Sequence, residues 1–267
     1  MRLLFAIGIA LAFSVAPALA GNFEDGARFY KDKNYEKALD LWQKAAAQGH
    51  APAQFSLGFM HEKGEGTTVD HRQAAAWYRH AAEAGYAAAQ TNLGFLYEKG
   101  QGVAQDNEQA VYWYQKAAQQ GTAEAQFNLG RMYQTGQGMA QDYAQAASWF
   151  RKAGEQGHIW AQSALGLMHE MGQGVARDTR QALHWYQRAA EKGDSMAQFD
   201  LGRIYEAGQG GVAMDYVEAH KWWDVAASNG EERARRSRVQ VERLMTPEQI
   251  AEAKRRAQEW MEAHAKK

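Results

Sequence analysis

Residues 53–58 read Ala-Gln-Phe-Ser-Leu-Gly, and the pattern Ala-x-x-x-Leu-Gly within them decides the fold. The pattern returns at 89–94, 125–130, 161–166 and 197–202, so one copy begins every 36 residues. A fixed period of this length is the sequence signature of a repeat protein, in which each repeat is one supersecondary unit. The chain is therefore expected to be one array of repeats, although its 267 residues alone would suggest two ordinary domains.

Three further features keep the same register. They are a Gly-x-Gly pair such as Gly64 and Gly66, an aspartate such as Asp70, and an aromatic pair such as Trp77 and Tyr78. Gly-x-Gly predicts the end of a first helix, because glycine accepts the left-handed backbone found there. The aspartate, followed three residues later by Gln or Glu, predicts a capping box that begins a second helix. In the capping box the Gln or Glu side chain is expected to reach back to the aspartate N–H.

Two small or polar positions suggest how the predicted helices pack. Gly58 and its equivalents lower helix propensity by about 1 kcal/mol each, so a close approach of another helix must compensate. A glutamine follows the first alanine of every repeat, and we expect it to form a hydrogen bond between helix ends of adjacent repeats. These glutamines are Gln54, Gln90, Gln126, Gln162 and Gln198. One helix pair cannot bury its own apolar face, so neighbouring pairs are expected to stack.

Composition and motifs argue against several classes of function. Without cysteine there is no disulfide, thiolate metal site or cysteine nucleophile, and a net charge of −1 gives no electrostatic reason to expect nucleic acid. His61 and His169 lack a second histidine four residues later, so no His-Glu-x-x-His zinc site exists. No serine stands in Gly-x-Ser-x-Gly, and the Gly-x-Gly pairs follow predicted helices and not strands. We therefore assign no catalytic residue, no metal and no cofactor.

The repeated residues resemble the Sel-1-like repeat family, a relative of the tetratricopeptide repeats. The resemblance rests on Ala-x-x-x-Leu-Gly, Gly-x-Gly, the aspartate and the aromatic pair, and covers about residues 23–230. It implies an all-α fold, an α/α superhelical solenoid of tandem helix-turn-helix repeats, and a role as an adaptor or scaffold. A cysteine-rich bacterial branch has an attributed β-lactam activity. This chain has no cysteine and does not resemble that branch.

The two ends of the chain differ from the repeats. Residues 1–20 are predicted to be a secretory signal peptide, because an apolar run follows Arg2 and small residues precede a cleavage site after Ala20. An uncleaved anchor or a buried first helix are the alternatives. Residues 21–50 are expected to form a tetratricopeptide-like unit, 51–230 five repeats, and 231–267 a C-terminal helical cap. The basic charge of that cap could instead serve an anionic partner.

We expect partner-binding residues in slots that vary between repeats, on the first helices and opposite their core faces. In related solenoids the first helices line a concave groove, which suits a protein or peptide segment. Arg131 and Arg203 would meet carboxylates of the partner. The alternative is that the phenylalanines pack on the neighbouring repeat. The candidate residues are Phe55, Phe59, Phe95, Phe127, Arg131, Trp160, Leu167, Phe199 and Arg203.

Three functions follow from these observations. The first is an exported, periplasmic, non-enzymatic scaffold that binds a protein or peptide partner in envelope regulation or assembly, with no membrane insertion after signal cleavage. The second is a secreted host-interaction factor with the same binding mode. The third is a cell-wall or β-lactam hydrolase, which the absence of cysteine and of any catalytic motif disfavours. The sequence does not identify the partner or the oligomeric state.

Overall fold

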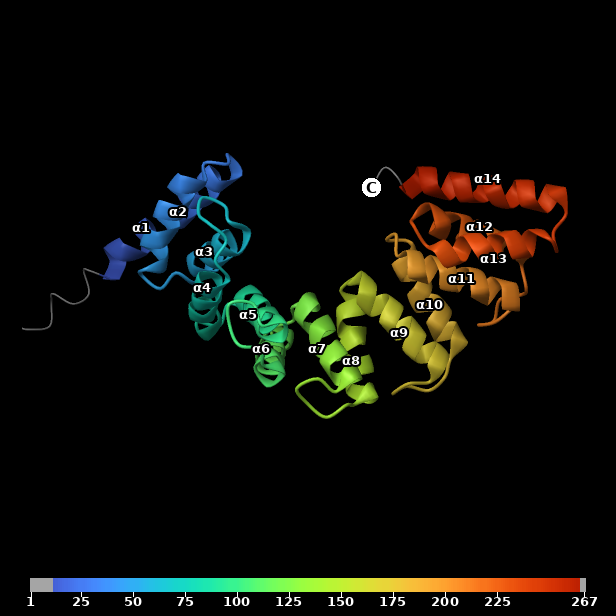
Figure 1. The fold of residues 1–267 in the computed structure, drawn as a ribbon, viewed down its shortest axis with the longest axis horizontal. Helices are drawn as coiled ribbons and strands as arrows, with labels where there is room; N and C mark the ends of the chain where they lie inside the picture. The colour runs from blue at the N-terminus through green and yellow to red at the C-terminus, as the bar shows by residue number, and fades with distance from the viewer. Residues whose placement is uncertain (1–11, 265–267) are drawn as a thin grey trace, which may run out of the picture. The chain divides into compact units, whose positions relative to one another are not determined.

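The computed structural model describes residues 12–264, and side chains from residue 21 onward. These residues form fourteen α-helices and no β-strand (Figure 1). The helices are α1 (Ala12–Lys31), α2 (Tyr35–Ala46), α3 (Ala51–Lys63), α4 (His71–Glu83), α5 (Ala87–Lys99), α6 (Asn107–Gln119), α7 (Ala123–Thr135), α8 (Tyr143–Glu155), α9 (Ile159–Met171), α10 (Thr179–Ala190), α11 (Ser195–Ala207), α12 (Tyr216–Ser228), α13 (Glu232–Glu242) and α14 (Pro247–His264). The all-α class predicted from the repeat pattern is confirmed.

An aspartate begins the second helix of five repeats. The carboxylate of Asp70 accepts hydrogen bonds from the N–H groups of Arg72 and Gln73, at 2.9 and 3.0 Å. The equivalent residues Asp106, Asp142, Asp178 and Asp215 cap their helices in the same way. The prediction that the Gln73 side chain accepts a hydrogen bond from the Asp70 N–H is wrong. The backbone N–H of Asp70 donates instead to the carbonyl of His61 at 2.8 Å, so the preceding helix already satisfies it.

The first helix of most repeats ends at a glycine in the left-handed conformation. Gly64 has φ 72° and ψ 30°, and its N–H donates to the carbonyl of Met60. The equivalent residues Gly100, Gly172 and Gly208 end α5, α9 and α11 similarly. A side chain is strained at such φ values, which explains why these ends carry glycine.

The Leu-Gly pair of each repeat lies where two helices meet. A Cβ atom on Gly58 would lie 2.6 Å from Cδ1 of Tyr78, which is closer than real contacts allow. Leu57 and Tyr78 are both fully buried, and the Tyr78 hydroxyl donates to Glu62 at 2.8 Å. The ring therefore has no room to move, and the predicted close approach at the glycine is confirmed.

The repeated glutamine joins neighbouring repeats. Its side-chain amide donates to a carbonyl in the last turn of the preceding second helix, as in the hydrogen bond of 3.0 Å from Gln198 to Ala190. Gln54, Gln90 and Gln162 make the equivalent hydrogen bonds to Ala46, Ala82 and Gly154. Because these amides are buried, losing the bond would leave a polar group unsatisfied. The predicted link between helix ends is confirmed.

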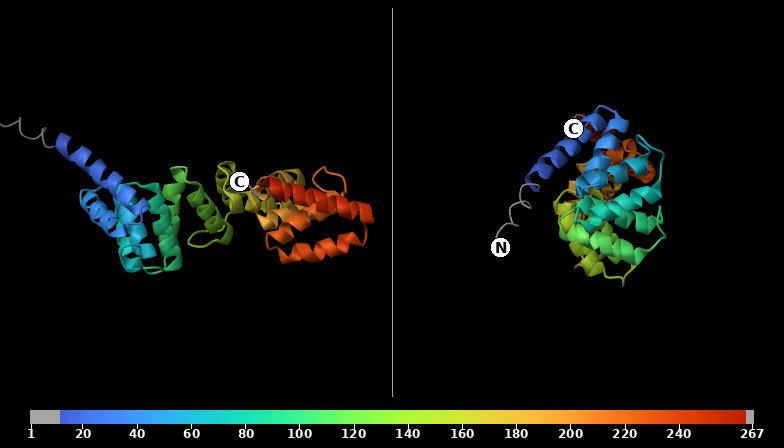
Figure 2. Two further views of the ribbon diagram at one scale, coloured as in Figure 1. Left: turned by 90° about the horizontal axis from the view of Figure 1, so that it is seen from above. Right: turned by 90° about the vertical axis from the view of Figure 1, so that its left-hand side faces the viewer.

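The chain comprises two compact units. The first ends at Ala125 and includes Gln137–Met139, and the second comprises Gln126–Gly136 and Ala140–Lys267. In the first unit each helix from α1 to α6 packs against the next one in the chain (Figures 1 and 2). In the second unit α8, α9, α10, α11 and α12 pack successively. This arrangement of consecutive helix pairs is that of an α/α solenoid.

The N-terminal helix crosses the expected cleavage site. Residues 1–11 of the expected signal peptide lie outside the described residues, and α1 continues past Ala20 to Lys31. Cleavage after Ala20 stays a prediction. The short turn to α2 places Lys33 at φ 59° and lets Asn34 cap α2 through the N–H of Lys37. Between residues 12 and 264, no helix combines the length and apolar character that crossing a membrane requires.

Two further helices complete the second unit. Both α13 and α14 pack on α12, and α13 is an element that the sequence pattern did not separate. Thr246 and Gln249 form a reciprocal capping box at the start of α14. The Thr246 N–H donates to Oε1 of Gln249 at 2.9 Å, and the Gln249 N–H donates to Oγ1 of Thr246 at 3.3 Å. Ala253 and Ala257, four residues apart on one face of α14, are fully buried.

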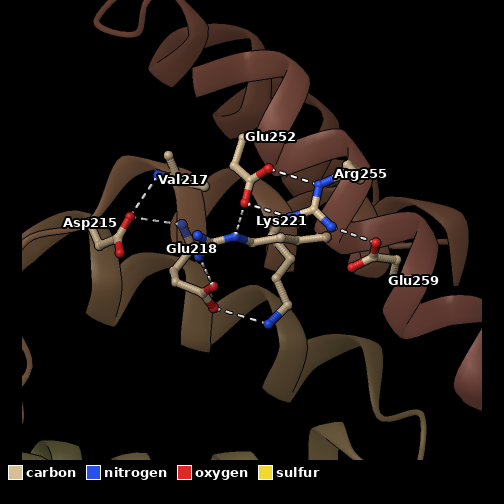
Figure 3. Close-up of polar contacts among 8 residues, drawn as sticks. Asp215, Val217, Glu218, Lys221, Glu252, Arg255 and Glu259 are labelled. Carbon is tan, nitrogen blue, oxygen red and sulfur yellow. Dashed lines mark hydrogen bonds and ion pairs between the residues drawn. The ribbon is translucent and has the colours of Figure 1, made fainter. Parts of the chain in front are cut away.

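An ion pair between Arg256 and Glu218 joins α14 to α12, and further ion pairs lie within each helix (Figure 3). Glu218 of α12 accepts from Lys221 at 3.0 Å and from Arg256 of α14 at 2.9 Å. Glu252 accepts from both Arg255 and Arg256, and these hydrogen bonds lower the pKa of Glu252 to about 2. Arg255 and Arg256, in the middle of α14, therefore have carboxylate partners within the chain.

Candidate functional site

The open face of the second unit is built from the first helices of successive repeats, α7 from Gln126 onward, α9 and α11. These helices share their core residues and differ on the opposite side. Phe127 of α7 and Phe199 of α11 correspond to Ser163 of α9, and Asn128 and Asp200 correspond to Ala164. Because α9 carries two small residues where its neighbours carry larger ones, space is left on this face.

That space is a groove of about 260 Å³, called here the α9 groove. All the residues that line it belong to the second unit. They are Phe127, Arg131, Gln134, Phe150, Trp160, Ser163, Ala164, Leu167, Tyr186, Asp194, Met196 and Asp200. Four of the nine predicted binding residues, Phe127, Arg131, Trp160 and Leu167, meet in this one groove.

The rim of the α9 groove is apolar and open. Trp160, Leu167 and Met196 have exposed fractions of 62, 40 and 55%, which are high for side chains of this kind. Phe127 lies deeper, stacked on His158 at 4.5 Å and with its ring centre 6.1 Å from that of Trp160. Exposed apolar surface in one place often marks an interaction site, and tryptophan is enriched at the centres of interfaces.

Along α11 the groove meets a network of charged side chains. The Arg203 guanidinium donates to Glu170 at 2.6 Å and to Asp200 at 3.0 Å, and the buried Tyr186 hydroxyl donates to Glu170 at 2.9 Å. Burial raises the pKa of Asp200, and the Arg203 charge offsets this only in part. Burial by itself would lower the pKa of Arg203, but the hydrogen bonds to Glu170 and Asp200 outweigh it and the net direction is upward. Arg203 thus already holds two carboxylates of its own chain.

Phe199 does not present its ring to the open face. It is 8% exposed, packs 6.5 Å from Trp223, and is covered by the Arg233 guanidinium at 4.5 Å. Phe199 thus packs on α12 of its own repeat and under α13, and not on the first helix of a neighbouring repeat.

The remaining candidates, Phe55, Phe59 and Phe95, lie in the first unit. Phe55 packs between Tyr78 and Tyr86, with ring centres 5.5 and 5.3 Å away. Phe59 and Phe95 each have the lysine of the next helical turn over the ring, at 5.6 Å in both cases. Phe95 is 43% exposed, so part of this face is also open.

Sequence reasoning missed two acidic residues of the α9 groove, Asp194 and Asp200. In the earlier repeats the slot of Asp194 holds His50, Tyr86, Thr122 and His158, and that of Asp200 holds Ser56, Asn92, Asn128 and Ala164. Both acids are thus confined to one repeat. A search of each slot for charge changes would have found them, whereas a search for bulky residues did not.

The histidines noted in the sequence are packed side chains. Burial lowers the pKa of both His61 and His169, which favours the neutral imidazole. Within residues 12–264 there is no group of three His, Asp or Glu side chains arranged to hold a metal ion.

Comparison with known families and structures fits this description. The family model described as Sel1 repeat matches six segments, 18–50, 51–86, 87–122, 123–158, 161–194 and 195–231. A similar solved structure is c5321, described as a protective antigen present in uropathogenic Escherichia coli strains displaying an SLR fold. It is 32% identical with a TM-score of 0.83, and the match covers 98% of this chain and 56% of that one.

Two further relatives extend the comparison. A Sel1 repeat protein from Oxalobacter formigenes is 32% identical with a TM-score of 0.75, over 91% of this chain and 99% of that one. Chitin synthase regulatory factor 3 of Schizosaccharomyces pombe is 44% identical over 61 residues, which are 22% of this chain and 6% of the yeast protein. The chain thus spans about half of the E. coli protein and a small part of the yeast one.

Proposed function

Because the chain belongs to the Sel1 repeat family, we propose that it is a non-enzymatic interaction protein that holds a segment of a protein partner in the α9 groove. Sel1-repeat proteins generally mediate protein–protein interaction, and the family is typically a non-catalytic scaffold. The observation that carries the proposal is the groove itself, where four variable-slot residues meet around an apolar hollow.

The size of the α9 groove favours a side chain of a partner over a free ligand. Pockets for small molecules usually measure about 300–1,000 Å³ and bury most of the ligand. The α9 groove, at about 260 Å³, is smaller and open. Residues of several helices line it, which suits an extended or helical segment that inserts one large residue.

A binding experiment with variants at the rim of the α9 groove tests this proposal. The chain is used to capture a protein from the envelope fraction of its own source, and the identified partner is then purified and titrated. We expect Trp160→Ala/Met196→Ala to bind it at least tenfold more weakly than the unaltered chain. The matched control is Val69→Ala/Phe95→Ala, which removes two exposed apolar side chains from the first unit and should leave the affinity unchanged. Equal affinities for all three chains would refute the proposal.

We place the protein in the periplasm after export. The support is the sequence of residues 1–20, with its apolar run and small residues before Ala20. The mass of the chain recovered from cells tests this, because cleavage predicts an N-terminus at Gly21. Recovery of the full-length chain from the cytoplasm would contradict it.

A secreted factor that contacts a host is the second candidate. The observation in its favour is that the similar E. coli protein is described as a protective antigen, although the chain spans only about half of it. Fractionation separates the two candidates, since the first predicts the protein in the periplasm and the second in the medium. Turnover of a β-lactam or peptidoglycan substrate would overturn the non-enzymatic assignment.

A further inference from the structure

The two sides of the α9 groove differ in charge. Arg131 lines it from α7, whereas Asp194, which caps α11, and Asp200 of α11 line the other side. The Arg203 guanidinium joins Asp200 to Glu170, because it donates hydrogen bonds to both carboxylates. Asp194, Asp200 and the adjoining Glu170 of α9 are thus three carboxylates in one region that has the single guanidinium of Arg203.

Asp194 is held in a fixed position by the helix that it begins. Its carboxylate accepts a hydrogen bond from the N–H of Ala197 at 2.7 Å, which caps α11. Lys192, the nearest cation in the sequence, donates to the carbonyl of Gly157 instead. Among residues 21–264, no lysine or arginine forms an ion pair with Asp194, so this groove-lining carboxylate has the N-terminus of α11 as its partner and no side-chain cation.

Asp200 also lacks full compensation. It shares Arg203 with Glu170, and Arg233, the other arginine nearby, is paired with Glu231 at 2.8 Å. Burial raises the pKa of Asp200, and the charges of Arg203 and Arg233 offset this only in part. A cation brought into the α11 side of the groove would favour the ionised carboxylates there.

We propose that the α9 groove selects a partner segment in which a large apolar residue is accompanied by a lysine or arginine. The apolar side chain enters the hollow between Trp160, Leu167 and Met196, and the cation lies against Asp194 and Asp200. This inference rests on the proposed function, because it names the partner chemistry of the same groove.

Selection from a random library of displayed peptides twelve residues long tests the inference. The chains used are the unaltered protein, Trp160→Ala/Met196→Ala, and Asp194→Asn. Asn caps helices as well as Asp does, so Asp194→Asn removes the charge and keeps the start of α11. Circular dichroism verifies that the three chains have equal helix content.

We expect the unaltered chain to enrich peptides that contain both a large apolar residue and a basic residue. Asp194→Asn should still enrich the apolar residue but lose the preference for the basic one. A synthetic peptide from the selected set should bind Asp194→Asn about fivefold more weakly, the factor that about 1 kcal/mol in a partly exposed ion pair corresponds to. The same peptide should bind the unaltered chain more weakly as NaCl rises from 50 to 500 mM.

The outcomes separate the inference from the proposed function. Peptides that are apolar without a basic residue, or that carry acidic residues instead, would overturn the inference and leave the groove as a binding site. Equal affinity of the selected peptide for Asp194→Asn would also overturn it. No enrichment beyond that of Trp160→Ala/Met196→Ala would overturn both.

Discussion

The first helices of the two units carry the same pattern of core residues and differ in their open faces. In α3 and α5, Phe59 and Phe95 each lie under a lysine of their own helix. In α9 and α11 the same slot holds Leu167 and Arg203, and small residues beside Leu167 leave a groove. The comparison shows that the slots that set helix packing are constant, whereas the slots on the opposite side of the same helices are free to define a binding surface.

The largest expected effect comes from a constant slot. A Cβ atom on Gly166 would lie 2.7 Å from Cδ1 of Tyr186, whose hydroxyl is tied to Glu170. Gly166→Ala should lower the free energy of unfolding by about 2–3 kcal/mol, even though alanine gains about 1 kcal/mol in helix propensity. Urea denaturation followed by circular dichroism measures this. Ser163→Ala, in a variable slot of the same helix, is the control and should stay within about 0.5 kcal/mol.

A smaller loss of stability is expected from the charged network of the second unit. Arg203→Met would leave Glu170 and Asp200 without their shared cation, and we expect a loss of about 1–2 kcal/mol. Lys63→Met in the first unit removes a more exposed pair with Glu62 and should cost less than about 0.5 kcal/mol. Equal losses of stability in Arg203→Met and Lys63→Met would show that the Arg203 network contributes no more than a surface ion pair.

The pH dependence of stability isolates Asp200. Because the pKa of Asp200 is raised in the folded chain, ionising it opposes folding, and protonating it removes that cost. As the pH falls through the raised pKa toward the ordinary value of 3.8, the unaltered chain should gain stability relative to Asp200→Asn. Urea titrations of both chains from pH 7 to pH 4 measure this. If the unaltered chain instead gained stability relative to Asp200→Asn as the pH rises, Asp200 would be stabilised as the carboxylate.

The smallest effect is expected where the proposed binding residues are most exposed. Trp160→Ala/Met196→Ala should change the free energy of unfolding by no more than about 0.5 kcal/mol per residue, because both side chains are more than half exposed. The control Val69→Ala/Phe95→Ala should behave alike. Thermal unfolding of the three chains checks this. A large loss of stability in Trp160→Ala/Met196→Ala alone would show that the rim of the α9 groove contributes to the core.

Most of the fold follows from the sequence because it depends on residues that recur. The period of 36 residues places Gly58 and its equivalents, the capping aspartates and the linking glutamines, and each has the same local role in every repeat. The capping box failed at Asp70 because its N–H is taken by His61, a contact between helices that local pattern does not encode. The short helix α13 lies outside the repeat and lacked such a signal.

The candidate site was less predictable for a different reason. Phe127, Arg131, Trp160 and Leu167 were found because large or charged residues stand out in variable slots. The hollow between them is lined by two small residues, Ser163 and Ala164. A position where a large side chain is missing does not form a recognisable sequence motif. The pairing of Arg203 with Glu170 joins residues 33 apart, so only the packed repeats reveal it.

The central claim is that a protein segment binds at the α9 groove, and photo-crosslinking tests its location directly. The amino acid p-benzoylphenylalanine is introduced in place of Trp160 in one chain and of Phe95 in another, both are produced in the native cell, and adducts are identified by mass spectrometry. The account predicts one partner protein joined through position 160, with the crosslinked fragment carrying a large apolar residue, and no such adduct from position 95. The same partner crosslinked from position 95 and not from 160 would contradict it.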